Sequence, residues 1–165
     1  MQRFNRSSDV STEARLFDVL DRWCAADRSF GLVAVDLDAF ASSGGPRSGL
    51  TAERALSASV ARLRCASRGG LVAWLGADEL VVACDATSAA ELTAIADRVV
   101  SALAAPVEVG HRQVRINAHV GAALARPGER PEAVLAMAEI ARDQARRSGA
   151  GTWHLARHTH NFAAA

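Results

Sequence analysis

Acidic side chains stand at two places in the sequence where their type and spacing would suit metal-ion chemistry. Asp36 and Asp38 end a short apolar segment, and Asp78 and Glu79 follow later in a predicted turn. Side chains of an extended segment alternate between its two faces, so Asp36 and Asp38 emerge together with the Leu37 carbonyl between them. Carboxylates at the end of a buried strand are costly unless a cation meets them. Hard oxygen ligands of this kind suit Mg²⁺ or Mn²⁺ bound together with phosphate oxygens.

Two divalent ions bound side by side at these acids could activate an attacking hydroxyl and stabilise a pyrophosphate leaving group. This hypothesis requires the predicted turn to lie beside the strand that ends in acids. The alternative is that each acid only caps or solvates the end of a strand or turn. The spacing by itself favours neither interpretation.

The hydrophobic pattern predicts a sheet that would bring the acids together. The uninterrupted apolar run 31–35 is typical of a strand buried on both faces. Residues 71–75 and 80–84 flank the turn 76–79 and predict a β-hairpin. Helical spacing of apolar residues predicts helices at about residues 12–26, 51–66, 88–104 and 131–147. Further strands are expected at about residues 107–109, 114–124 and 152–155. This order predicts an α/β sandwich built on a ferredoxin-like core.

Length and composition limit the classes of protein that the chain can form. A chain of 165 residues is long enough for one domain. We expect a flexible N-terminus over 1–11, a single domain over 12–157 and a flexible tail over 158–165. The net charge of +1 gives no broad basic field for nucleic acid or a membrane surface. No apolar run would cross a bilayer and no secretory leader is evident, so a cytoplasmic protein is expected. The cysteines stand singly in apolar stretches, which predicts buried, reduced thiols: Cys24, Cys65 and Cys84.

Four segments resemble motifs of the bacterial GGDEF (diguanylate cyclase) family, and they occur in the family's order. Residues 30–40 resemble its first strand, which ends in Asp-Leu-Asp-x-Phe. Residues 76–80 read Gly-Ala-Asp-Glu-Leu where the family has Gly-Gly-Asp-Glu-Phe. Residues 117–122 are similar to the strand Thr-Ala-Ser-Ile-Gly-Ile, and residues 138–149 resemble the last helix. The resemblance implies a palm-type (nucleotidyl cyclase-like) fold, with a central mixed sheet and flanking helices.

The resemblance also implies a chemistry for the acids. Members of the family bind GTP with two metal ions and, by facing a second copy, join two GTP molecules into cyclic di-GMP. Carried over to this chain, the metal ligands for Mg²⁺ or Mn²⁺ are Asp36, the Leu37 carbonyl and Asp78. Asp78 and Glu79 are the implied catalytic residues.

Positions that contact phosphate and guanine in the family differ in this chain. Ala41 replaces a phosphate-gripping lysine and Gly44 replaces an asparagine that reads guanine. Glu53 matches a guanine-recognising aspartate, and Arg146 stands at a phosphate-binding lysine, so both remain implied nucleotide-binding residues. Further substitutions are Ala77 for a signature glycine, Ala150 for an arginine, and the pair Arg142-Asp143 for Leu-Tyr. Ser67 and Gly70 stand where the inhibitory product site has Arg-x-x-Asp, so feedback by cyclic di-GMP through that site is not expected.

These differences lead to a functional prediction with stated alternatives. We expect a degenerate GGDEF domain in cyclic di-GMP-type signalling, a regulatory or nucleotide- or partner-binding module with little or no cyclase activity. The alternative is an active diguanylate cyclase or a nucleotidyl cyclase of altered specificity; a third is a purely structural oligomerisation module. Expected partners are GTP or another nucleotide, and a second copy or a protein partner. His119 replaces a small family residue and is either a core histidine or a group near the phosphate site.

Overall fold

The computed structural model describes residues 10–38, 50–76, 79–109, 111–149 and 151–157. The helices are α1 (Glu13–Ala25), α2 (Leu50–Ala66), α3 (Ala89–Ala104) and α4 (Pro131–Ser148). The longer strands are β2 (Gly31–Asp38), β3 (Leu71–Trp74), β4 (Glu79–Cys84) and β7 (Asn117–Leu124). The shorter ones are β1 (Ser11–Thr12), β5 (Val107–Val109), β6 (Arg112–Val114) and β8 (Trp153–Leu155). The predicted helices and the hairpin are confirmed to within a few residues.

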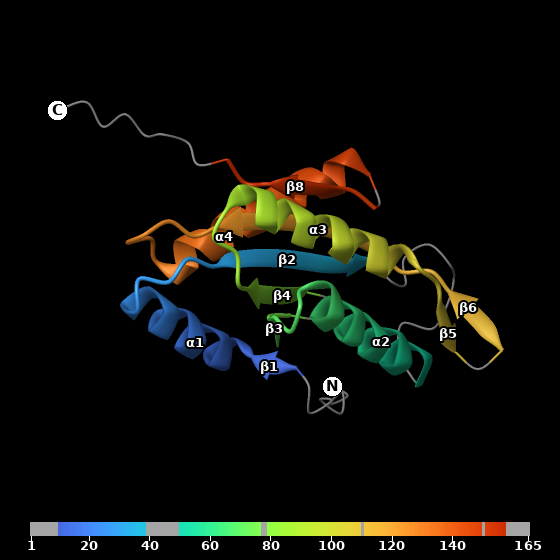
Figure 1. Cartoon of the computed structure of the whole chain (residues 1–165). Coiled ribbons are helices and arrows are strands. Elements are labelled where there is room, and N and C mark those ends of the chain that lie inside the picture. The colour runs from blue at the N-terminus through green and yellow to red at the C-terminus, as the bar shows by residue number, and fades with distance from the viewer. Residues whose placement is uncertain (1–9, 39–49, 77–78, 110, 150, 158–165) are drawn as a thin grey trace.

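The main sheet has six strands in the order β1-β3-β4-β2-β7-β8, with β2 in the interior (Figure 1). The four central strands β3, β4, β2 and β7 pair antiparallel with one another, whereas the edge strands β1 and β8 pair parallel with β3 and β7. The succession β2-α2-β3-β4-α3-β7 is a ferredoxin-like βαββαβ unit. The predicted palm-type mixed sheet with flanking helices is therefore confirmed, and β2 has the hairpin on one side and β7 on the other.

Strand β2 separates two hydrophobic cores, because its successive side chains point to opposite faces. Val33, Val35 and Leu37 join the core formed with α2 and α3. Leu32 and Ala34 join the core formed with α1 and α4. The same alternation places Asp36, an implied metal ligand, on the α4 side of the sheet.

Local signals in the sequence account for the helix ends. Thr12 caps α1, where its hydroxyl accepts a hydrogen bond from the Arg15 N–H, and Ser88 caps α3 in the same way. Helix α4 begins with Pro131 in its first turn and ends at Gly149, whose φ of 111° favours glycine.

Two strand predictions need correction. The predicted strand 114–124 is divided into β6, which pairs with β5 in a separate hairpin, and β7, which joins the main sheet. The hairpin lies at one end of the molecule in Figure 1, so the chain has to pass from one sheet to the other between the two strands. Strand β1 was not predicted, since two residues carry no periodicity. Ser11 pairs with Ala73, so the sheet begins inside the segment 1–11 expected to be flexible; residues 1–9 and 158–165 lie outside the described part.

The prediction of three buried thiols is wrong for Cys65, which lies on the exposed side of α2. Cys24 is half-buried and Cys84 is buried, and all three cysteines are free thiols. Burial, with a smaller contribution from the nearby Asp85 carboxylate, raises the pKa of the Cys84 thiol to about 12.

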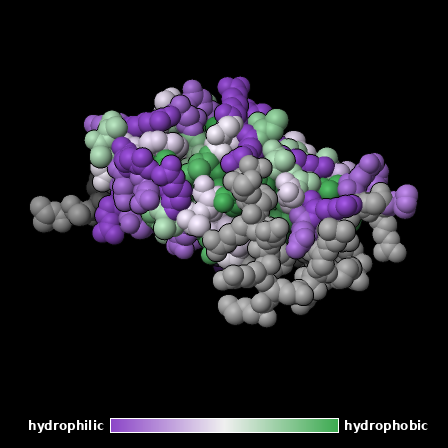
Figure 2. All heavy atoms as spheres, turned by 90° about the horizontal axis from the view of Figure 1, so that it is seen from below, coloured by the Kyte–Doolittle hydropathy of each residue, from purple (hydrophilic) through white to green (hydrophobic). Residues whose placement is uncertain are grey.

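The surface seen in Figure 2 is mostly polar, with apolar side chains gathered toward its middle. Among the residues described, Ile140 is the exposed large apolar side chain. None of the described helices combines the length and the apolar character that crossing a membrane requires.

Candidate active site

Sheet pairing brings three polar residues into one row across the strands. Asp36 of β2 lies directly opposite Glu79 of β4 and directly opposite His119 of β7. Directly paired residues on neighbouring strands point to the same face, so this row faces α4. The condition stated from the sequence, that the hairpin lie beside the first strand, is met.

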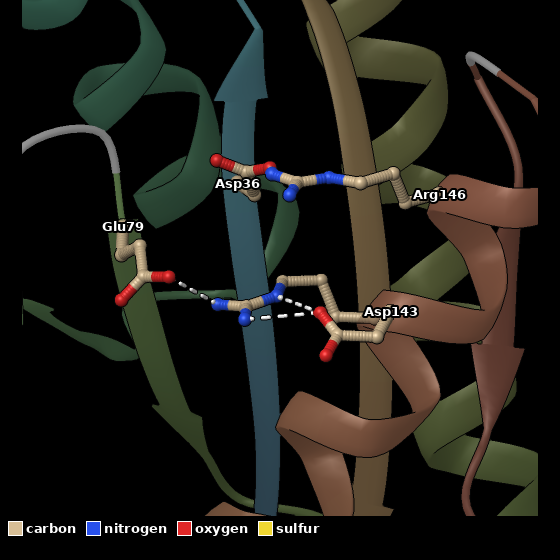
Figure 3. Close-up of polar contacts among 5 residues, drawn as sticks. Asp36, Glu79, Asp143 and Arg146 are labelled. Atoms are coloured by element: carbon tan, nitrogen blue, oxygen red, sulfur yellow. Dashed lines mark hydrogen bonds and ion pairs between the residues drawn. The ribbon is translucent and has the colours of Figure 1, made fainter.

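Asp36 is the buried carboxylate of this row, with 6% of its surface exposed. Its Oδ2 forms an ion pair with Nη2 of Arg146, which reaches over from α4 (Figure 3). A buried carboxylate is costly unless a cation compensates it, and here the compensating cation belongs to the protein itself.

Arg142, one turn before Arg146 on the same helix face, compensates the second acid. Its Nη1 donates to Oε1 of Glu79 at 3.0 Å, as a dashed line in Figure 3 marks. Its Nε and Nη2 donate to Oδ1 of Asp143 at 3.4 and 3.2 Å. The Arg142 side chain is only 11% exposed, whereas that of Glu79 is 42% exposed. The guanidinium is therefore the more deeply buried member of the pair.

The close approach of α4 to β7 places both arginines over the row. A Cβ atom at Gly121 would lie 2.0 Å from the Arg142 nitrogen and 2.1 Å from the Ala138 oxygen, both backbone atoms of α4. Only glycine permits this separation between helix and strand. Gly121 therefore sets how far the side chains of α4 reach across β2 toward β4.

Glu139 of α4 and His119, the third member of the row, are the other polar groups near Asp36 and Glu79. Burial raises the pKa of the Glu139 carboxyl; Arg142 opposes this shift, and Glu79 and Asp143 add to it. His119 is 7% exposed, and its Nδ1 is buried without a hydrogen-bond partner. His119 thus lies beside Asp36 rather than elsewhere in the core, although no contact assigns it a chemical role.

Of the remaining predicted site residues, Leu37 and Glu53 are described by the structure, and their side chains lie away from the row. Leu37 directs its side chain to the opposite core, away from the row. Glu53 is exposed in the first turn of α2. Asp78 and the side chain of Asp38 lie outside the described part of the chain.

Arg142 was noted from the sequence only as a replacement for a family leucine, and its pairing was missed. The available signal was its i, i+4 spacing from Arg146, which puts both guanidiniums on one helix face.

Ser67, which stands in the region of the family's product site, has a structural role. Its hydroxyl donates to the Leu63 oxygen and accepts from the Gly70 N–H, which closes the turn between α2 and β3. A Cβ at Gly70 would lie 2.9 Å from the Ala83 carbonyl oxygen, so a side chain there would collide with β4. Ser67 and Gly70 therefore stabilise the turn between α2 and β3.

The sequence profile described as "Diguanylate cyclase, GGDEF domain" matches residues 10–152. The chain belongs to the GGDEF family. Among proteins with curated descriptions, none matches this sequence.

Solved structures agree with this membership. The GGDEF domain of TpbB (YfiN) from Pseudomonas aeruginosa is similar at 26% identity and a TM-score of 0.77, over 90% of this chain and 91% of that one. The GGDEF domain of DgcB from Caulobacter crescentus, solved with c-di-GMP, has 19% identity and a TM-score of 0.77, over 95% and 97% of the two chains. The diguanylate cyclase SiaD from Pseudomonas aeruginosa, solved with its activator SiaC, has 21% identity and a TM-score of 0.79. This chain aligns over 89% of its own length with 59% of SiaD. The last two comparisons support the fold alone.

Two of the implied metal ligands, Asp36 and the Leu37 carbonyl, belong to the described residues, whereas Asp78 lies outside them. Within the described ranges, no three His, Cys, Asp or Glu side chains are arranged to hold an ion. Asp36 and Glu79, the acids that the row brings together, each have a guanidinium of α4 as their partner. A metal ion at the row would have to displace or approach these cations.

Proposed function

We propose that this GGDEF domain acts in cyclic di-GMP-type signalling as a regulatory or nucleotide-binding module with little or no cyclase activity. The observation that carries the proposal is that Asp36 and Glu79 have Arg146 and Arg142 of the same chain as their partners, and that Arg142 stands where the family has leucine. A two-metal mechanism needs these acids to hold or support metal ions. Carboxylates that already have cationic partners attract such ions weakly.

The sequence supports the same proposal on the substrate side. Ala41 and Gly44 lack the side chains with which the family grips phosphate and reads guanine. A lost contact to the charged phosphate typically costs about 1.5–3 kcal/mol and a lost neutral hydrogen bond to guanine about 0.5–1.5 kcal/mol, so the two losses together weaken GTP binding by roughly one and a half to three orders of magnitude. Glu53 and Arg146 are the implied nucleotide contacts that remain.

Mg²⁺ or Mn²⁺ would be held, on this proposal, by Asp36, the Leu37 carbonyl and Asp78, and would supply charge stabilisation to a bound triphosphate. Arg146, which pairs with Asp36 in the structure, would be available to a nucleotide phosphate when an ion takes its place, so we expect a bound nucleotide to strengthen metal binding. The domain would act in the cytoplasm, with a second copy or a regulatory protein as its partner.

The deciding experiment incubates the purified chain with GTP and either Mg²⁺ or Mn²⁺ and separates the products by chromatography. A diguanylate cyclase of known activity serves as the positive control. Calorimetric titration with GTP and with cyclic di-GMP then measures binding in the absence of turnover. Robust formation of cyclic di-GMP that Asp78→Ala abolishes would refute the proposal and establish the active cyclase instead. Turnover of a different nucleoside triphosphate would support altered specificity.

A further inference from the structure

We infer that Arg142 is a built-in cation that takes the place of a divalent metal ion beside Glu79, and that it keeps the carboxylate row metal-free. The inference concerns the same site as the proposed function and rests on it for the role of the acids. It adds a specific cause and a specific ligand class. A single side chain, that of Arg142, lowers the affinity of the row for divalent cations.

The contacts of Arg142 show that its guanidinium is fixed in place. The side chain is 11% exposed and donates three hydrogen bonds, one to Glu79 and two to Asp143. A guanidinium that is nearly buried is stable only beside acceptors that compensate it, and both acceptors here are carboxylates. Moving it away from Glu79 would therefore be costly, unlike moving a solvated surface arginine.

The charge of the cluster explains the effect on a metal ion. The carboxylates of Asp36, Glu79 and Asp143 form ion pairs with the guanidiniums of Arg142 and Arg146, and the Glu139 carboxyl interacts electrostatically with Arg142 and Glu79. The two guanidiniums offset much of the negative charge of this cluster, and both repel a divalent ion at the row. Removing Arg142 takes away one of these positive charges and frees the Glu79 carboxylate.

Arg142 rather than Arg146 is the residue particular to this chain. Arg146 stands where the family resemblance already implies a basic residue, so a cation there is expected. Arg142 stands where the family usually has leucine. Because Gly121 holds α4 against β7, a long basic side chain at this position extends across β2 to the acid on β4.

The test measures binding of Mn²⁺ alone to the full chain, by loss of the free-ion electron paramagnetic resonance signal and by calorimetry. The variants are Arg142→Leu, which restores the apolar family residue, and Arg142→Lys, which keeps the charge. Arg147→Leu is the matched control, because it removes one charge from an exposed position on the same helix. We expect Arg142→Leu to bind Mn²⁺ at least about tenfold more tightly than the wild type. Arg142→Lys and Arg147→Leu should bind within about twofold of the wild type.

Equal affinity of Arg142→Leu and wild type for Mn²⁺ would overturn the inference. An equal gain in Arg147→Leu would do the same, because it would make the effect one of net charge. Circular dichroism checks that each variant is folded, and Arg142→Met, which keeps the length of the stem, replaces the leucine variant if that one unfolds. Cyclase activity of the wild type would refute the proposed function whatever the Mn²⁺ affinities are. Failure of Arg142→Leu to gain Mn²⁺, in a chain without cyclase activity, would refute only this inference.

Discussion

Replacing Gly121 with alanine is the most direct test of how the candidate site is positioned. The added Cβ would lie 2.0 Å from the Arg142 nitrogen, 2.1 Å from the Ala138 oxygen and 2.7 Å from the Ala141 carbonyl carbon. All three atoms belong to the backbone of α4, so no side-chain rotation relieves the contact. The helix has to move away from β7.

The required movement follows from the contact distances. Ordinary contacts of a Cβ begin at 3.4 Å, so the shortest contact must open by about 1.4 Å (3.4 minus 2.0). Overpacking of this kind typically costs about 1–3 kcal/mol, and a clash between backbones belongs at the upper end of that range. For a domain of this size, about 3 kcal/mol lowers the melting temperature by about 6–12 °C. The same shift stretches the pair between Arg142 Nη1 and Glu79 Oε1 from its present 3.0 Å and weakens it.

The assay is thermal unfolding followed by circular dichroism, with Gly76→Ala as the control. At Gly76 the nearest atom to an added Cβ is Oε2 of Glu79 at 3.5 Å, an ordinary contact with a movable side chain. We expect the control to unfold within about 1–2 °C of the wild type, as surface substitutions usually do. A Gly121→Ala variant that unfolds as late as the control would refute the argument that helix contact at this glycine places the arginines.

Two further predictions concern residues away from the row. In the native protein at pH 8, a thiol reagent should modify the exposed Cys65 rapidly and Cys84 only after unfolding. The reason is that Cys84 is buried and its thiol pKa is raised to about 12. Rapid modification of both cysteines would contradict the packing of β4. Hydrogen bonds from the Thr87 N–H and hydroxyl lower the pKa of the exposed Glu91 carboxyl. The ionised carboxylate therefore stabilises the folded protein above the unfolded pKa near 4.5, and this stabilisation is lost as the pH falls through the lower pKa of the folded state. Glu91→Gln should therefore melt below the wild type at pH 7 and together with it in strong acid, and a constant difference across that range would rule out this linkage.

Much of the fold could be read from the sequence because its signals are local. Apolar runs and helical spacing predicted the helices, the central strand and the hairpin, and Thr12 and Ser88 cap helices that begin where the pattern begins. Strand β1 was missed because two residues carry no period. Cys65 was misassigned because an apolar neighbourhood in the sequence does not decide which side of a helix faces solvent.

The sequence by itself also pointed to Asp36 and Glu79, and it showed that residue types differ at several positions where the family contacts phosphate and guanine. It did not determine the partners of those acids. Glu79 and Arg142 are far apart in the chain and meet only because β4 lies beside β2 and because Gly121 lets α4 settle closely on β7. The charge state of the row is a property of that packing: the sequence supplies the carboxylates and the guanidiniums, and the tertiary structure alone brings them together as pairs.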